Sequence, residues 1–485
     1  MAKEAVIKGG NDFRHENQDF RNTKNKLDSV GCGFCLAKWT QVTLQMQTGH
    51  NHSCHHPRTH KIPVSEIQRN PSALHNTLYK KRRRKEMLEG KRPTECGYCW
   101  NVEDSSNQFS DRVFKSNESW SKPHFDEIKN LHWREDFNPR YVEVSFSHTC
   151  NFKCSYCGPA YSTTWQQEVE KFGGYPTTDD FNGKKQHLEE GKWPRKKTEH
   201  NPYVEAFWKW WPDLYYDLHT FRITGGEPLL SKDTWKVLDY IIEQPNPNRK
   251  LQLAINSNLG IDDKLVDRFI EKINRICDGD KVKEFIIFTS VDTWGKQAEY
   301  IRNGLEFNRI WDNLNKILTK CPRVNITIMS TYNALSVPNY HKLIDGILGL
   351  KEDYGTADRY WASAVFLDSS YLRYPQHQSV QILPEKWNDV VLNQAKLAYF
   401  YGIPSFSYDY IGYSDIEIQK IKRIHDWMSG GGKVDLTKLN SMRRNFYHYF
   451  KAHDERRGTD FCKTFPELES FYRKCGTIKI DGYDN

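Results

Sequence analysis

Apolar residues alternate with polar ones in short segments along the middle of the chain. In "YVEVSFSH" (141–148), Val142, Val144 and Phe146 fall on one face, which is the period of a half-buried strand. Further apolar segments of strand length follow at residues 221–224, 251–257, 284–290, 325–331 and 360–366. The pattern therefore predicts six strands.

Segments with helical periodicity stand between most of these predicted strands. It is clear in residues 231–244 and again in residues 262–276, where one face carries Val266, Phe269, Ile270 and Ile273. Strands joined by helices usually lie parallel, so the pattern predicts an α/β fold with a parallel sheet, open or curled into a partial barrel. In such folds, ligands collect at the carboxyl ends of the strands.

The segments around this central region follow other patterns. Residues 1–28 read as a polar leader, residues 30–104 surround one predicted helix with cysteines, and residues 371–485 form a mostly helical extension. The charged insertion at 173–202 contains Gly and Pro, which favours a surface loop. The aromatic cluster at 207–216 is interpreted as core packing or, alternatively, as part of a substrate wall.

The N-terminal region contains a helix signal with clear boundaries at residues 71–89. Asn70 can cap it, Pro71 suits its first position and Gly90 ends it. Its basic run, Lys80 to Lys85, is either a solvated helix face or a nucleic-acid patch.

Composition narrows the class of protein. The 485 residues are 14% aromatic with a mean hydropathy of −0.79, which indicates a polar but folded chain. The net charge of +8, from 70 basic and 62 acidic residues, is too mild to indicate nucleic-acid binding by itself. The sequence has neither an apolar stretch of membrane-spanning length nor a signal-peptide core at its start, so we expect a cytoplasmic protein without a membrane partner.

The twelve cysteines are better interpreted as metal or redox ligands than as disulfides. Eight of them fall in tight groups, which are Cys32, Cys35, Cys54, Cys96, Cys99, Cys150, Cys154 and Cys157. The other four are scattered and are expected to be buried or inert: Cys277, Cys321, Cys462 and Cys475.

Cys150, Cys154 and Cys157 follow the first predicted strand of the central region at C-x3-C-x2-C spacing. Thiolates are the usual iron–sulfur ligands, and three of them can hold a [4Fe–4S] cube while one iron keeps no protein ligand. An open coordination position is typical of a metal site that does chemistry. The spacing therefore indicates a catalytic cluster whose fourth ligand is a small molecule.

A second motif, "GGEP", stands at the carboxyl end of the second predicted strand and comprises Gly225, Gly226, Glu227 and Pro228. Glycines there let the backbone approach a ligand closely, and a carboxylate can accept a hydrogen bond from an amino group. The motif is a weak turn signal alone and becomes specific when it follows the three-cysteine loop.

Together, the two motifs resemble those of the radical S-adenosylmethionine (SAM) enzymes over residues 140–370. The resemblance implies a partial (β/α)6, TIM-like barrel in which the cysteines bind a [4Fe–4S] cluster and SAM chelates the open iron. It implies that the GGEP segment meets the SAM amino group. It also implies an electron donor, such as flavodoxin or ferredoxin, and reductive cleavage of SAM to a 5′-deoxyadenosyl radical that abstracts hydrogen from a substrate.

Six further residues match the family by position, and the resemblance implies that they contact SAM: Tyr156, Ser257, Asn258, Ser290, Asp292 and Arg302. Tyr156 matches the aromatic residue that packs near the adenine, and Ser290 and Asp292 match candidates for the ribose or carboxylate. Arg302 matches a partner for the SAM carboxylate, with an ordinary surface ion pair as the alternative. One departure is Leu259, which stands where many members have glycine.

Residues 32–104 resemble the twitch and SPASM modules, which hold an auxiliary [4Fe–4S] cluster in many radical SAM enzymes. The resemblance implies four ligands, which are Cys35, Cys54, Cys96 and Cys99. Cys32 is left over. The module precedes the barrel here, whereas the family normally places it afterwards, and the longer SPASM cysteine set is absent, so a single-cluster twitch module fits better. The alternative is a zinc ribbon built from the C-x2-C pairs at 32–35 and 96–99.

The sequence thus predicts a radical SAM oxidoreductase or modifying enzyme with an auxiliary cluster. A peptide or protein is the favoured substrate, while some relatives act on small molecules such as aminoglycosides or nucleotides. The alternative from another class is a metal-braced nucleic-acid-binding module that uses the basic residues 80–85.

Overall fold

The computed structural model describes residues 18–195, 199–356, 363–402, 411–430 and 434–479. The chain divides into two compact units, each built from several segments. Unit 1 comprises residues 1–146, 195–225 and 245–254. Unit 2 comprises residues 147–194, 226–244 and 255–485.

The main sheet has nine strands in the order β11-β10-β8-β7-β6-β4-β1-β2-β3. Their bounds are β1 Gln41–Gln45, β2 His50–His52, β3 His60–Lys61, β4 Tyr141–Ser145, β6 Thr220–Thr224, β7 Gln252–Asn256, β8 Glu284–Ser290, β10 Val324–Tyr332 and β11 Val365–Tyr371. The pairs β1–β4, β4–β6, β8–β10 and β10–β11 are parallel, whereas β2 pairs antiparallel with β1 and β3. A large parallel sheet with helices confirms the predicted α/β class; its closure into a partial barrel stays a prediction.

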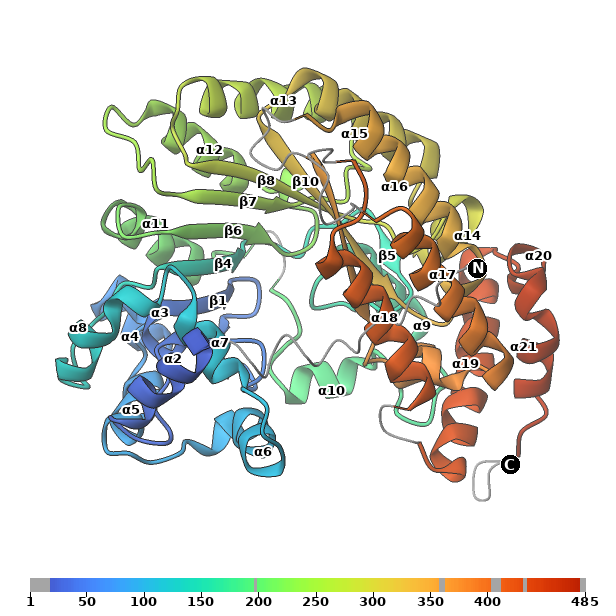
Figure 1. Ribbon diagram of the computed structural model, residues 1–485, viewed down its shortest axis with the longest axis horizontal. Helices are drawn as coiled ribbons and strands as arrows, with labels where there is room; N and C mark the ends of the chain where they lie inside the picture. Colours follow the sequence, from blue (N-terminus) through green and yellow to red (C-terminus); the bar gives the residue numbers. More distant parts are fainter. Residues whose placement is uncertain (1–17, 196–198, 357–362, 403–410, 431–433, 480–485) are drawn as a thin grey trace, which may run out of the picture. The chain divides into compact units, whose positions relative to one another are not determined.

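Unit 1 contains a strand that the hydrophobic pattern did not predict. In β1, four of the five residues are buried. The strand therefore lacks the alternation of apolar and polar residues by which a half-buried strand is recognised. It pairs in parallel with β4, where Val42 lies opposite Val142 and Leu44 lies opposite Val144. The cysteine-rich N-terminal region thereby extends the parallel strands of unit 1, and β1, β4 and β6 lie side by side in Figure 1.

The helices of unit 1 are mostly short. They are α2 Gln18–Asp28, α3 Ala37–Thr40, α4 Val64–Arg69, α5 Leu78–Leu88, α6 Gly97–Ser105, α7 Asp111–Asn117, α8 Phe125–Asn130 and α11 Pro202–Tyr215. In α11, which carries the aromatic cluster, Phe207 and Trp211 are buried, and the Trp211 ring centroid lies 4.7 Å from that of Phe221 in β6. These contacts confirm the core-packing interpretation for this helix.

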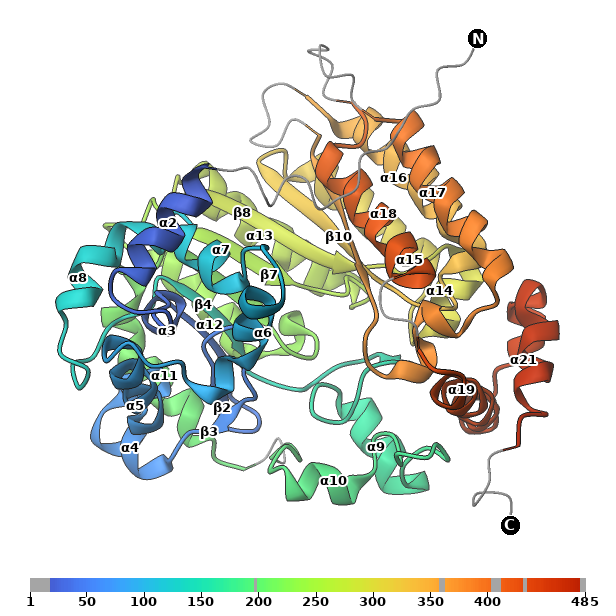
Figure 2. The ribbon, with the colours of Figure 1, turned by 60° about the horizontal axis from the view of Figure 1, so that its bottom comes forward.

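The helices of unit 2 include those predicted from periodicity. They are α9 Thr163–Phe172, α10 Lys184–Glu189, α12 Lys232–Glu243, α13 Asp263–Asp278, α14 Gly295–Ile301, α15 Phe307–Lys320, α16 Tyr340–Tyr354, α17 Asn388–Phe400, α18 Asp415–Ser429, α19 Leu436–Arg457, α20 Phe461–Thr464 and α21 Glu469–Cys475. All four apolar residues of the predicted α13 face are buried. Helix α17 packs against both α16 and α18, and the three helices lie together in Figure 2.

Several boundaries differ from the sequence prediction. The last strand of the sheet is Val365–Tyr371 rather than 360–366, and residues 357–362 lie outside the described part of the chain. The predicted leader contains α2, and residues 1–17 lie outside the described part. The predicted surface loop at 173–202 contains the short helix α10.

The predicted helix at 71–89 is interrupted. A short 3₁₀ helix (Pro71–Leu74) begins at the Asn70 cap, and α5 begins only after Thr77. The Thr77 hydroxyl accepts a hydrogen bond from the Lys80 N–H at 3.2 Å, so Thr77 starts a second helix with its own cap. Among the described helices, none is both long and apolar enough to cross a lipid bilayer.

Candidate functional site

The three-cysteine loop follows β4 and lies in unit 2. Cys154 belongs to the two-residue strand β5 (Lys153–Cys154), which pairs antiparallel with β9 (Arg302–Asn303). The backbone N–H of Cys150 donates to Thr163 Oγ1 at 3.2 Å, at the start of α9. The loop is therefore held between a short ribbon on one side and a helix on the other.

Buried side chains from distant segments hold the backbone carbonyls of this loop. The Tyr449 hydroxyl donates to Ser155 O at 2.6 Å, and the Arg457 guanidinium donates to Lys153 O at 2.7 Å. Both donors belong to α19. Closer in sequence, Trp165 Nε1 donates to Cys154 O at 2.9 Å.

The three cysteines of the loop are partly buried. Burial, followed by the neighbouring Cys154, raises the pKa of Cys157 to about 12. Burial likewise raises the pKa of Cys150, again with Cys154 as the next contribution. Thiols in this environment are protonated at neutral pH, so they become thiolates when a cation binds them.

Gly226 and Glu227 of the second motif pack directly against the residues that precede Cys150. The Gly226 N–H donates to Ser147 O at 3.1 Å, and the Glu227 N–H donates to Thr149 O at 2.7 Å. A Cβ on Gly226 would lie 2.4 Å from Thr149 O, which leaves no room for a side chain. Gly226 therefore allows the GGEP turn to meet the start of the cysteine loop.

The Glu227 carboxylate is buried and joins two strand ends. It accepts hydrogen bonds from Leu229 N at 3.0 Å and Ser257 Oγ at 2.8 Å on one oxygen, and from Asn258 N at 2.6 Å on the other. Burial raises the pKa of Glu227 to about 7 despite these donors. A carboxylate has about four acceptor positions, and donors from the described part of the chain occupy three of them, with one donor on Oε2.

After β7, the backbone at Leu259 has the conformation expected of the glycine that it replaces. Leu259 has a φ of 53°, in the left-handed region that favours glycine. Its N–H donates to Ser257 Oγ at 3.1 Å, and its side chain is buried. The backbone thus keeps a conformation that suits glycine, although a leucine occupies it.

Three of the predicted SAM-contacting residues lie together beside Cys154. Arg302 Nε and Nη2 donate to the two oxygens of Asp292 at 2.8 and 3.1 Å, and Arg302 Nη1 donates to Cys154 Sγ at 3.5 Å. The Tyr156 hydroxyl donates to Asp292 Oδ2 at 2.7 Å. Arg302 thus forms a buried ion pair rather than the alternative surface pair.

The remaining predicted residues lie at strand ends. Gly225 has a φ of 122°, Pro228 is buried, and Ser290 is the last residue of β8, opposite Met329. Asn258 Nδ2 donates to Asn151 Oδ1 at 2.9 Å, next to Cys150.

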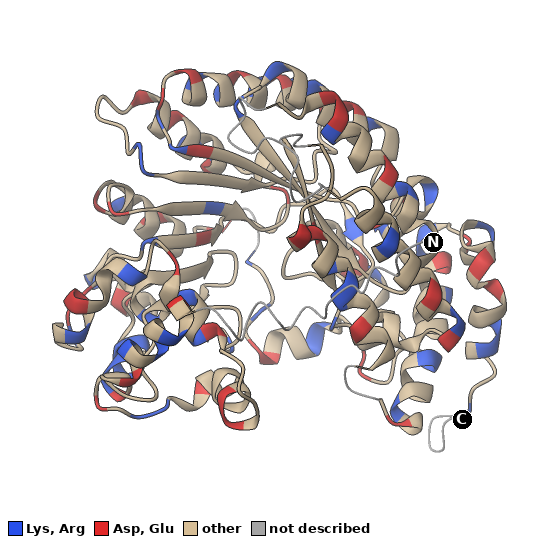
Figure 3. Cartoon of the chain, in the orientation of Figure 1, with Lys and Arg blue, Asp and Glu red and all other residues tan. Residues whose placement is uncertain are grey.

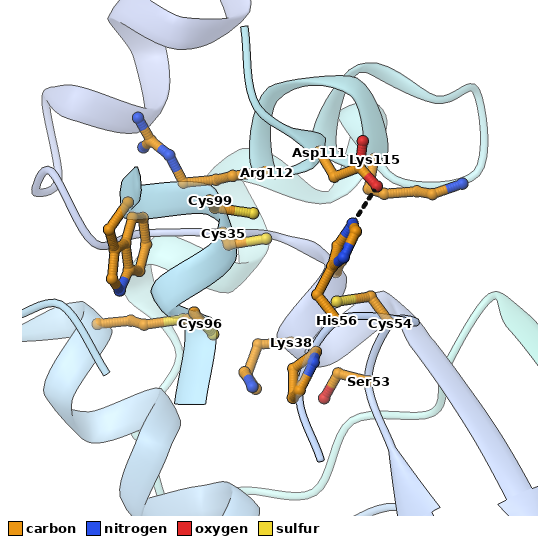
Figure 4. Close-up of a pocket in the computed structure, with 14 residues that line it drawn as sticks. Cys35, Lys38, Ser53, Cys54, His56, Cys96, Cys99, Asp111, Arg112 and Lys115 are labelled. Atoms are coloured by element: carbon orange, nitrogen blue, oxygen red, sulfur yellow. Dashed lines mark hydrogen bonds and ion pairs between the residues drawn. The ribbon is translucent and has the colours of Figure 1, made fainter. Parts of the chain in front are cut away.

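The four cysteines expected to hold an auxiliary cluster line one pocket in unit 1. Cys35 precedes α3, Cys54 follows β2, and Cys96 and Cys99 lie at the start of α6. The sulfur atoms of Cys35 and Cys99 lie next to each other in Figure 4. Burial raises the pKa of Cys35 to about 12, with Cys99, Cys54 and Cys96 as further contributions in that order.

Cys32 does not line this pocket. Its side chain is exposed, and its sulfur contacts Gly90 O at 3.7 Å. In the described part of the chain, there is no group of three or more His, Cys, Asp or Glu side chains arranged to hold a single metal ion.

Basic side chains border the auxiliary pocket from the buried side. Lys38 lines the pocket, is 3% exposed and forms an ion pair with Glu95. Burial lowers the pKa of Lys38, but Cys96 and Glu95 outweigh it, so the net shift is upward. Behind Lys38 lie Lys80 and Arg84, which are also buried.

The basic run at 80–85 is therefore not one exposed face. Lys80 Nζ donates to Gln41 O at 3.2 Å, and Arg84 donates to Asn76 Oδ1 at 2.8 Å inside unit 1. Lys81 forms an ion pair with Asp136. Basic and acidic residues are interspersed along the helices in Figure 3.

Comparison with known proteins supports the superfamily suggested by the motifs. No family model matches the chain. Over 181 residues the chain is 26% identical to a protein named GTP 3′,8-cyclase from Psychromonas ingrahamii (strain DSM 17664 / CCUG 51855 / 37). The match spans 37% of this chain and 44% of that protein, so the chain covers less than half of the relative's length. Because that relative is a radical SAM enzyme, the similarity supports the radical SAM superfamily.

The local motifs did not reveal the residues that support the cysteine loop. Tyr449 and Arg457 lie about 300 residues from the carbonyls that they hold. Their signal in the sequence was only the helical periodicity of the C-terminal extension, which says nothing about the segment that it contacts.

Proposed function

We propose that the chain is a radical SAM enzyme that holds one [4Fe–4S] cluster on Cys150, Cys154 and Cys157 and binds SAM at the open iron. When bound, the cluster and SAM supply a 5′-deoxyadenosyl radical that abstracts hydrogen from a substrate. The observation that carries the proposal is the direct contact between the cysteine loop and the GGEP turn: Gly226 and Glu227 donate to the backbone just before Cys150.

The residues around this site fit the two cofactors. Three partly buried cysteines in one loop match a cluster with an open iron. The remaining acceptor position on Glu227 Oε2 suits the SAM amino group. The chain's task is to position both cofactors and to exclude water from the site.

We also propose a second, auxiliary [4Fe–4S] cluster on Cys35, Cys54, Cys96 and Cys99. Its support is a charge argument. Lys38 lines the pocket and is 3% exposed, and both Cys96 and its ion-pair partner Glu95 raise its pKa. Buried cations need negative partners, and a cluster held by four thiolates carries negative charge. Four protein ligands would leave this cluster to relay electrons or to brace the pocket.

For the substrate, we propose a peptide or protein, on the resemblance of residues 32–104 to twitch and SPASM modules. The printed name of the relative, GTP 3′,8-cyclase, favours a nucleotide as the second candidate. A flavodoxin or ferredoxin is the proposed electron donor. Screening peptides and nucleoside triphosphates for stimulation of SAM cleavage distinguishes the two classes.

The test of the proposed reaction is SAM turnover. Anaerobically reconstituted protein with dithionite and SAM is expected to form 5′-deoxyadenosine and methionine, since uncoupled cleavage needs only the cluster and its open iron. Chromatography measures both products. A reconstituted protein that carries iron–sulfur absorption but forms neither product would contradict the proposal. Salt-dependent DNA or RNA binding by that inactive protein would favour the nucleic-acid-binding alternative.

Glu227→Gln is expected to weaken SAM binding about tenfold, or about 1.4 kcal/mol, while the iron content stays at the wild-type level. The amide keeps the shape of the side chain but loses the charge that stabilises a hydrogen bond from an ammonium group. Equilibrium binding of SAM to the reconstituted protein measures the change.

The matched control is Glu271→Gln, which changes an exposed carboxylate on α13. The thermal stability of both variants is measured as well, because Glu227 also accepts hydrogen bonds from Ser257 and Asn258. Iron loss that parallels the loss of SAM binding would show that Glu227 serves the fold instead.

A further inference from the structure

We propose that Arg302 is a positioning residue whose hydrogen bond to the Cys154 sulfur raises the reduction potential of the cluster on the three-cysteine loop. The inference rests on the proposed function, because it needs a cluster on Cys154. It assigns Arg302 to the cluster, whereas the family resemblance assigns it to the SAM carboxylate.

The backbone places Arg302 opposite Cys154. In the ribbon of β5 and β9, Cys154 pairs with Arg302 and Lys153 pairs with Asn303. Directly opposite residues of an antiparallel pair have their Cβ atoms about 5 Å apart on the same face. The Ser155 N–H donates to Ile301 O at 2.7 Å and continues the pairing by one residue.

A glycine fixes the end of this ribbon. Gly304 has a φ of 104°, a conformation that side-chain-bearing residues rarely adopt. A Cβ there would lie 2.8 Å from Asn151 O. The segment "YIRNG" (300–304) can therefore lie against the cysteine loop because its last residue is glycine.

The Arg302 side chain is held in one orientation. Two of its nitrogens donate to the two Asp292 oxygens at 2.8 and 3.1 Å, a planar arrangement that matches a carboxylate. Asp292 itself is 0% exposed and accepts from the Thr331 N–H at 2.8 Å. With Nε and Nη2 committed to Asp292, Nη1 points to Cys154 Sγ at 3.5 Å.

This geometry suits control of a cluster better than capture of a ligand. Hydrogen bonds to cluster sulfurs and nearby charge set the reduction potential of iron–sulfur centres. A donor to the thiolate stabilises the extra negative charge of the reduced cluster, so the potential rises. Arg302 is 8% exposed, and low solvent access strengthens such an interaction.

Arg302→Gln should therefore shift the midpoint potential of this cluster to a lower value in the absence of SAM. Arg302→Lys keeps a cation that can donate to sulfur, and its shift should be smaller. Anaerobic redox titration followed by electron paramagnetic resonance measures the potentials. A parallel sample with added SAM identifies the signal of this cluster, since its spectrum changes when SAM binds.

The matched control is Arg309→Gln, which removes an exposed arginine that pairs with Asp263 on the surface of unit 2. Its potential should equal that of the wild type. An unchanged potential in Arg302→Gln with weaker SAM binding would overturn the inference in favour of a SAM-carboxylate contact. Loss of the cluster from both folded Arg302 variants would also overturn it, because Arg302 would then serve assembly.

These outcomes are separable from a failure of the proposed function. If the wild-type protein has no cluster signal that responds to SAM, the proposed function fails. If that signal is present but the Arg302 variants have the same midpoint potential as the wild type, the proposed function stands and this inference fails.

Discussion

Changing Cys154 to alanine is expected to abolish reductive SAM cleavage by the reconstituted protein. Two thiolates on a three-cysteine loop cannot hold a cube with one open iron, so the site loses both the cluster and the SAM anchor. Cys150→Ala and Cys157→Ala should have the same effect, because all three thiols belong to one partly buried loop. The measurement is 5′-deoxyadenosine formed per chain, with the iron content determined on the same sample.

Cys277→Ala is the matched control, since Cys277 is also buried but lies in α13 among apolar residues. It should retain wild-type turnover. Continued formation of 5′-deoxyadenosine by Cys154→Ala, above the level of protein without iron, would refute the assignment of the cluster to this loop.

The parts of the fold that the sequence predicted have local signals. The α13 face was recognised because four apolar residues recur at helical spacing, and all four are buried. β4 was recognised from the alternation of Val142 and Val144. Each of these patterns involves only a few neighbouring residues, and the structure buries the face that the pattern marks as apolar.

Features that depend on long-range contacts gave no such signal. β1 is buried on both faces, so its pattern lacks alternation. Lys80 and Arg84 belong to a run that looks solvated in sequence, yet both are buried because other segments supply their acceptors, including Gln41 O and Asn76 Oδ1. Burial of long basic side chains depends on distant partners, which a single sequence does not display.

The candidate SAM site also has features with a local sequence signal and features without one. The spacing of the cysteines and the GGEP turn identified the site, but spacing did not show which residues bind one another. Asp292 and Arg302 were expected to face SAM separately. In the structure they form a buried ion pair beside Cys154, and Glu227 binds Ser257 and Asn258. The contact between Arg302 and Cys154 joins residues 148 positions apart, and that between Glu227 and Ser257 joins residues 30 positions apart.

Cys35→Ala is expected to remove the auxiliary cluster, with a loss of about four irons per chain, whereas Cys32→Ala should keep the wild-type iron content. The physical reason is the position of the two thiols. Cys35 lines the pocket with Cys54, Cys96 and Cys99, and Cys32 is exposed outside it. Iron analysis and the absorption spectrum of each reconstituted variant measure the difference.

The triple variant with alanine at Cys150, Cys154 and Cys157 isolates the auxiliary site. It should still bind about four irons and show a brown [4Fe–4S] spectrum, although it cannot cleave SAM. One zinc and no iron in this variant would favour the zinc-ribbon alternative. Equal iron loss from Cys32→Ala and Cys35→Ala would show that the ligand set is wrong. Because Lys38 is buried in the wall of the pocket, loss of the cluster should also lower the stability of unit 1, and thermal unfolding of Cys35→Ala against Cys32→Ala measures that loss.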